Sequence, residues 1–115
     1  MSNKQLIGKV EDFKEKEAYG IDLESISILV VNQKGRLYVY ENRCPHRGIR
    51  LEWQPNQFLD YEKQFIQCAM HGALFRIEDG ECIAGPCPGE MLSALPFQIE
   101  EGLLFLINTN AELTD

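Results

Sequence analysis

Two short cysteine–histidine pairs constrain this chain more than any other feature of its sequence. Cys44 and His46 are separated by one residue, and Cys68 and His71 are separated by two. Each pair combines a thiolate with an imidazole, and both groups bind zinc, iron and iron–sulfur centres. Gly72 directly follows the second pair, where it lets the backbone turn close to a buried centre. The two pairs therefore predict a four-ligand centre, which holds either a single metal ion or a two-iron cluster.

The order of these ligands, C-x-H followed by C-x-x-H, resembles that of Rieske [2Fe–2S] proteins, in which two histidines replace two cysteines on one iron. The resemblance implies one Rieske-type [2Fe–2S] cluster as the cofactor. It also implies that Cys44 and Cys68 bind one iron as thiolates, and that His46 and His71 bind the other as neutral imidazoles. Because cysteine must lose its proton to bind iron, we expect cluster loading to weaken in acid.

Other stretches resemble the same family. Residues 68–75, with the sequence CAMHGALF, resemble the second cluster loop of soluble Rieske ferredoxins, and residues 85–86 resemble the proline loop that shields the cluster. The segment 47–67 between the two pairs is longer than the family pattern. Ile49 and Met70 stand where respiratory-complex Rieske proteins have two further cysteines, so the resemblance implies that the disulfide between the cluster loops is absent.

Two positions near the ligands bear on the reduction potential. High-potential Rieske proteins place serine and tyrosine hydroxyls near the cluster, and the matching residues here are Ala73 and Phe75. Neither side chain can donate a hydrogen bond, and fewer donors to the cluster sulfurs lower the potential. The resemblance therefore implies a potential at the low end of the Rieske range, roughly −150 mV.

Structural zinc is the main alternative for the four ligands, because zinc also uses two cysteines and two histidines. Zinc fingers usually separate the two ligand types, whereas each pair here mixes them, which favours the cluster. The other two cysteines, Cys82 and Cys87, are interpreted as a strand residue and a loop residue that bind no metal. A disulfide between them is not expected in a reducing cytosol.

Composition limits the class of protein. The 115 residues are 44% hydrophobic, which predicts a single globular domain over residues 1–115. No apolar run reaches the roughly 18 residues of a membrane span, and the first residues lack the pattern of a secretory signal, so we expect a cytoplasmic protein. The net charge of −7 argues against binding nucleic acid and suits steering toward a basic patch on a protein partner.

The pattern of short apolar runs and turn signals predicts an all-β fold, a Rieske-like small sandwich or barrel. Strands are expected near residues 4–10, 19–21, 26–31, 37–40, 64–67, 73–77, 82–84, 95–100 and 103–107. The last of these is apolar on both faces and is predicted to be a central, buried strand. An inserted cluster-binding subdomain is expected at roughly 43–90, on a base formed by 1–42 and 91–110.

Four protein ligands would leave no open position for substrate at iron, so the predicted activity is one-electron transfer rather than catalysis. The resemblance implies a soluble Rieske-type ferredoxin that accepts electrons from a flavin reductase and passes them to a terminal, ring-hydroxylating-type oxygenase. His46 and His71 would provide the exit route for the electron. At 115 residues there is no room for a catalytic mononuclear-iron domain. Two alternatives remain: the small subunit of an assimilatory nitrite reductase, and a non-catalytic, metal-stabilised binding or redox-sensing module.

Overall fold

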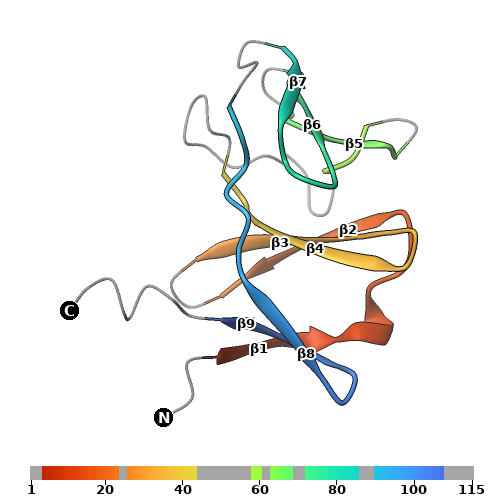
Figure 1. Cartoon of the computed structure of the whole chain (residues 1–115), viewed down its shortest axis with the longest axis vertical. Helices are drawn as coiled ribbons and strands as arrows, with labels where there is room; N and C mark the ends of the chain where they lie inside the picture. The colour runs from red at the N-terminus through yellow and green to blue at the C-terminus, as the bar shows by residue number, and fades with distance from the viewer. Residues whose placement is uncertain are drawn as a thin grey trace, which may run out of the picture.

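The computed structural model describes residues 4–23, 26–43, 58–60, 63–68, 72–85 and 90–107. Within these ranges the regular elements are nine β-strands and one short 3-10 helix (Figure 1). Their bounds are β1 (Lys4–Lys9), η1 (Val10–Asp12), β2 (Glu17–Asp22), β3 (Ser27–Gln33), β4 (Arg36–Glu41), β5 (Phe65–Gln67), β6 (Leu74–Arg76), β7 (Cys82–Ala84), β8 (Phe97–Glu100) and β9 (Leu103–Ile107).

The strands form three antiparallel sheets of three strands each. Sheet A has the order β1-β9-β8, sheet B the order β2-β3-β4 and sheet C the order β5-β6-β7. Sheet B has the longest ladders, with six residue pairs between β2 and β3 and six between β3 and β4. Sheet C is much smaller, since its strands are only three residues long.

Two tight turns fix the register of the longer hairpins. Lys34 and Gly35 join β3 to β4 with φ values of 56° and 79°, and Glu101 and Gly102 join β8 to β9 with 50° and 78°. Two consecutive residues with positive φ match the twist of an antiparallel hairpin, and glycine is favoured there because it has no Cβ.

Sheet B is the middle layer, and both of its faces are buried. In β3 the residues Ile28, Leu29, Val30 and Val31 are all 0% exposed. Because successive side chains of a strand point to opposite faces, alternate residues enter different cores. Ile28 and Val30 pack toward Leu104 and the rest of sheet A, whereas Leu29 and Val31 belong to the core shared with sheet C. Figure 1 shows this stacking, with sheet C above sheet B and sheet A below it.

The segment from residue 90 to residue 96 ties the three sheets together. It runs from the end of sheet C past β4 and on to β8 (Figure 1). The amide of Leu92 donates to the carbonyl oxygen of Gly80 at 2.9 Å, and the amide of Glu41 donates to that of Ser93 at 2.9 Å. These bonds satisfy backbone groups at the edges of two sheets, so the segment anchors sheet C to sheet B.

The all-β prediction is confirmed, and each predicted strand corresponds to an observed one. β9 is the central strand of its sheet as expected, but only Leu104 and Leu106 are buried and the alternate residues are half-buried. The strand that is buried on both faces is β3. The division into a base and a subdomain at 43–90 stays a prediction. Among the described residues, none forms a helix long and apolar enough to cross a bilayer.

Candidate metal centre

Cys68 is the predicted ligand whose surroundings the structure describes. It directly follows β5 and is 0% exposed. Its amide donates to the carbonyl oxygen of Ala73 at 2.9 Å, and the amide of Gly72 donates back to the carbonyl oxygen of Cys68 at 2.8 Å. Gly72 has a φ of +69°, which glycine adopts without strain. The backbone around Cys68 is thus closed into a tight connection between β5 and β6.

A close contact between two backbones places Gly85, directly after β7, against this connection. Gly85 follows β7 with a φ of +103°, and a Cβ atom built on it would lie 2.6 Å from the Cα of Ala73 and 3.0 Å from its Cβ. Real atoms do not approach so closely, so glycine is required both by conformation and by space. The sequence marked 85–86 as the start of a shielding loop. The contact with Ala73 was not predicted, because nothing in the sequence reveals which backbone a glycine faces.

The chain approaches the first predicted pair from a fixed point at the end of β4. Asn42 is 5% exposed, and its amide donates to the carbonyl oxygen of Ser27 at 2.8 Å. The predicted ligands Cys44, His46 and His71 lie outside the described residues, so the four-ligand grouping stays a prediction. The part of the chain that the structure describes holds no group of three or more His, Cys, Asp or Glu side chains able to bind a metal.

Cys82 lies on β7, as predicted, and is 2% exposed. It is paired with Phe75 of β6, and its thiol donates to the carbonyl oxygen of Ala84 at 3.3 Å. Its role as a non-ligand stays a prediction. The other predicted non-ligand, Cys87, lies outside the described residues.

One buried hydroxyl connects sheet B to the turn after β6. Tyr40 of β4 is 2% exposed, and its hydroxyl donates to the carbonyl oxygen of Ile77 at 2.5 Å. Burial, together with the nearby carboxylate of Asp79, raises the pKa of Tyr40 well above its ordinary value. The phenol therefore stays a donor across the physiological range. The sequence indicated a strand here but gave no sign of this partner 37 residues away.

Comparison with known proteins defines the family. Residues 3–100 match the Rieske [2Fe–2S] domain, which is most of the chain, so the chain belongs to the Rieske [2Fe–2S] family. A curated relative is the terminal oxygenase component of carbazole 1,9a-dioxygenase from a Sphingomonas species. It is 30% identical over 94 residues, which cover 76% of this chain. The match spans only 24% of that relative, or about a quarter of its length.

Solved structures have the same fold. The ferredoxin of Sphingomonas yanoikuyae B1 has a TM-score of 0.71 and 27% identity, and the match covers 91% of this chain and 98% of the ferredoxin. A chain in a complex of oxygenase and ferredoxin of carbazole 1,9a-dioxygenase has a TM-score of 0.78 and 25% identity. That match covers 93% of this chain but 29% of the other. A further chain, from a complex of reduced oxygenase and oxidized ferredoxin, shows the fold alone at 16% identity and a TM-score of 0.74.

The matched domain indicates one Rieske-type [2Fe–2S] cluster as the cofactor, and the described residues fit it. Cys68 supplies a buried sulfur on a connection closed by two backbone hydrogen bonds. The contact between Gly85 and Ala73 leaves no room for an added Cβ, so the chain is packed tightly beside that connection. Thiolate sulfur is the ligand that iron–sulfur clusters require.

Proposed function

We propose that this chain is an electron-transfer protein, a Rieske-type ferredoxin that carries one electron at a time. The observation that carries the proposal is the likeness to a ferredoxin over 98% of its length, in a chain that also contains the two cysteine–histidine pairs. We assign Cys44 and Cys68 as thiolate ligands of one iron, and His46 and His71 as imidazole ligands of the other. When bound, the cluster accepts and releases single electrons.

The residues around the proposed centre favour electron transfer over catalysis. Four protein ligands fill the cluster's external positions, so no iron position is left for a substrate. Burial of Cys68 excludes water from its sulfur, and Gly85 packs tightly on Ala73. A site that hardly rearranges loses little energy when its charge changes by one electron. We therefore assign no catalytic residue and do not class the chain as an enzyme by itself.

The potential follows from the side chains beside the connection after β5. Ala73 and Phe75 are both 0% exposed and have no hydroxyl group that could donate to a cluster sulfur. Fewer such donors leave the reduced form less stabilised, so we propose a potential of about −150 mV, the low end of the Rieske range. That value suits a carrier between a flavin reductase and an oxygenase.

The proposed acceptor is a terminal oxygenase, and the proposed donor is a flavin reductase. Similar chains occur in structures of oxygenase and ferredoxin complexes of carbazole 1,9a-dioxygenase, which supports an oxygenase as the partner. The chain's net charge of −7 favours approach to a basic surface on such a partner. We propose the cytoplasm as the location, on the basis of the sequence pattern of the first residues and the lack of a long apolar run.

A second candidate is the Rieske domain of a terminal oxygenase component itself. Two likenesses favour this second candidate. The chain is 30% identical to such a component, and it has a TM-score of 0.78 with a longer chain, of which the match covers 29%. In that case the same ligands would relay the electron to a catalytic iron within one protein. Both candidates make the same use of Cys68 and of the histidines.

Rapid mixing tests the proposed carrier role. The anaerobically purified, cluster-containing protein is reduced with one electron and mixed with an oxidised terminal oxygenase of the ring-hydroxylating type, and its visible absorption is followed. We expect reoxidation much faster than with buffer alone, and slower at high salt because screening weakens steering. A reduced protein that transfers no electron to any such oxygenase, nor accepts one from a flavin reductase, would contradict the carrier role.

A further inference from the structure

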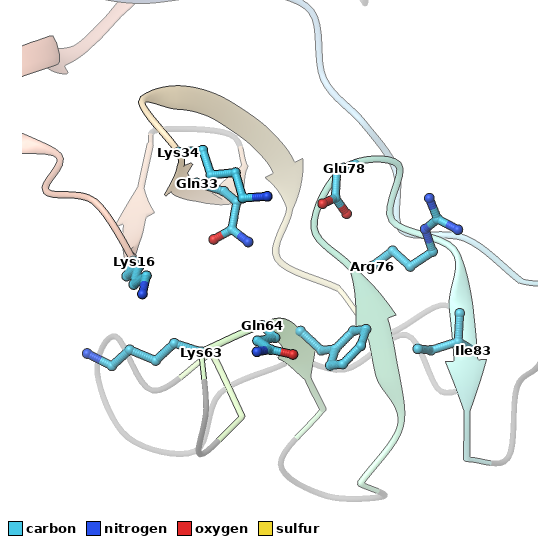
Figure 2. Close-up of a pocket in the computed structure, with 9 residues that line it drawn as sticks. Lys16, Gln33, Lys34, Lys63, Gln64, Arg76, Glu78 and Ile83 are labelled. Carbon is cyan, nitrogen blue, oxygen red and sulfur yellow. The ribbon is translucent and has the colours of Figure 1, made fainter.

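A cavity lies between sheet B and sheet C, and we call it the basic cavity. Its volume is about 610 Å³, which is within the range of small-ligand sites. Five separate segments contribute to its walls, and Figure 2 shows their side chains around the opening. The residues that line it are Lys16, Gln33, Lys34, Lys63, Gln64, Phe65, Arg76, Glu78 and Ile83.

The charge of the basic cavity is opposite to that of the chain. Four of its lining residues are lysine or arginine and one is acidic, although the chain as a whole has a net charge of −7. Within the described segments, neither Lys16 nor Lys34 forms an ion pair. Lys63 pairs with Glu17 at 2.8 Å, and both side chains are nearly half exposed. Exposed pairs of this kind are weak, so a bound anion can compete for the lysine.

The backbone at these lysines is unusual. Lys16, Lys34 and Lys63 have φ values of 63°, 56° and 60°. They are three of the four described non-glycine residues with positive φ, and the fourth is Glu101. Asparagine, aspartate or glycine is accommodated more easily in this conformation than lysine. Unfavourable backbone conformations cluster where a side chain has to be held for a ligand. Lys34 has this conformation as part of the β3–β4 turn and Lys16 lies in a turn before β2, so the backbone determines where these lysines lie but does not by itself assign them a role.

A buried acceptor points to a second property of the ligand. The Oε1 atom of Gln33 is buried and accepts no hydrogen bond from any residue that the structure describes. Figure 2 shows the amide end of this side chain extending from β3 into the basic cavity. A buried acceptor without a donor is costly, and a rotation of the Gln33 side chain that brings this oxygen to the cavity surface would let a hydroxyl group of a ligand satisfy it. Glu78, which lines another wall, repels anionic groups there and can also accept a hydroxyl hydrogen.

We propose that the basic cavity binds a small organic anion that carries two or more carboxylate or phosphate groups and at least one hydroxyl group. Lys16, Lys34 and Lys63 bind the anionic groups by charge-assisted hydrogen bonds. Gln33 accepts from the hydroxyl group, which an acidic side chain of a protein partner cannot offer. The proposal does not rest on the electron-carrier function, because none of these residues is a proposed cluster ligand.

Calorimetric titration tests this site with citrate, a hydroxytricarboxylate, as the probe. The whole cluster-containing protein is used at low ionic strength. We expect one citrate to bind, and Lys34→Gln and Lys16→Gln each to weaken binding about tenfold. Lys9→Gln is the matched control, since Lys9 lies on β1 and lines a different cavity. Removal of iron by citrate would be the same in all variants and could not produce this pattern.

A second probe isolates the hydroxyl group. Propane-1,2,3-tricarboxylate has the carboxylates of citrate without its hydroxyl, so we expect weaker binding to the natural protein and no such difference in Gln33→Leu. Equal effects of Lys9→Gln and Lys34→Gln would overturn the proposal, and so would the absence of citrate binding. Binding of a hexaglutamate peptide but not of citrate would also overturn it, and would assign the basic cavity to an acidic protein segment.

Discussion

Sheet B and sheet C differ in what holds their strands together. Sheet B has two ladders of six residue pairs, and its central strand buries four consecutive residues. Sheet C has one ladder of three pairs and one of two pairs with a register shift. Each fully buried aliphatic side chain of β3 contributes about 1.5–3 kcal/mol, so sheet B is stabilised by many similar contacts. Sheet C depends on a few specific ones.

The proposed metal centre lies beside sheet C, the sheet that is held together by fewer contacts. Cys68, Ala73 and Gly85 are positioned by two backbone hydrogen bonds and one close backbone contact. Such contacts fix geometry well, but the loss of any one is not compensated by neighbours. Single substitutions in sheet C should therefore affect the metal centre strongly, whereas comparable changes in sheet B should alter stability alone.

The largest effect is expected from removing the ligand on sheet C. Cys68→Ser replaces the proposed thiolate, so we expect nearly complete loss of bound iron and of the visible absorption. Cys82→Ser is the matched control because Cys82 is equally buried on the same sheet and its hydrogen bond to Ala84 can be made by a hydroxyl. We expect this variant to keep its iron. Iron analysis and the visible spectrum check both variants, and equal iron contents would contradict the ligand assignment.

The second effect concerns the backbone contact in sheet C. Gly85→Ala places a Cβ where the atoms of Ala73 already lie, and adds the cost of a positive φ. We expect a loss of about 3 kcal/mol in the free energy of unfolding and a reduced iron content. Gly35→Ala in the sheet B hairpin also has a positive φ, but nothing lies within 4 Å of its added Cβ. It should cost about 1 kcal/mol and retain its iron.

Urea unfolding and iron analysis measure these two glycine variants side by side. If Gly85→Ala and Gly35→Ala had equal effects, the contact between Gly85 and Ala73 would not be the feature that holds the loops of sheet C. The comparison between the sheets would then lose its main physical support.

The third effect tests the link between the two sheets. Tyr40→Phe removes the donor to the carbonyl oxygen of Ile77 and leaves that buried acceptor without its partner. We expect a loss of about 1–2 kcal/mol in the free energy of unfolding. Tyr38→Phe is the control, because Tyr38 lies on the same strand and is only partly buried. Denaturant unfolding measures the free energy of unfolding of both variants. Equal losses in Tyr40→Phe and Tyr38→Phe would contradict a stabilising role for this hydrogen bond.

The same residue gives a dependence on pH. Tyr40 has a pKa raised above its ordinary value of 10.0, so the unfolded chain releases the phenol proton first. Its contribution to stability is therefore complete below pH 10 and decreases as the pH rises above that value. We expect the natural protein to lose more stability than Tyr40→Phe between about pH 8 and about pH 11. If the free energy of unfolding changed with pH equally in the two proteins, burial of Tyr40 would not favour its protonated form.

The smallest effect is expected at the exposed ion pair that connects the two sheets. Lys63 and Glu17 are 2.8 Å apart, with side chains 44% and 48% exposed. Glu17→Gln should lower the free energy of unfolding by no more than about 0.5 kcal/mol, and high salt should remove the difference. Glu100→Gln, which removes a pair within sheet A, should behave alike. If Glu17→Gln alone lowered the free energy of unfolding by more than about 2 kcal/mol, the pair would contribute more than exposed ion pairs normally do, and the contact between the sheets would depend on it.

The strands could be predicted from the sequence because their signals are local. The apolar run at 26–31 and the turn at Lys34 and Gly35 are features of neighbouring residues, and β3 and β4 follow from them. The ligand pairs are also local, since their spacing is visible in the chain. The same reasoning placed burial on both faces at 103–107, whereas sheet stacking gives that burial to β3.

Features that depend on three-dimensional proximity could not be predicted. Tyr40 and Ile77 are 37 positions apart, and Gly85 meets Ala73 from a different loop. The basic cavity is the clearest case, because its lysines come from three separate connections between strands of an acidic chain. No periodicity or spacing joins such residues, so only the packing of sheet B on sheet C reveals them.

Low-temperature EPR of the dithionite-reduced, anaerobically purified protein, taken together with its visible spectrum and metal content, tests the central claim most directly. We expect a red-brown protein with two irons per chain and the low average g value of a reduced Rieske cluster, which two histidines on one iron produce. A colourless protein that contains one zinc per chain, and that assembles no cluster when iron and sulfide are supplied, would contradict it.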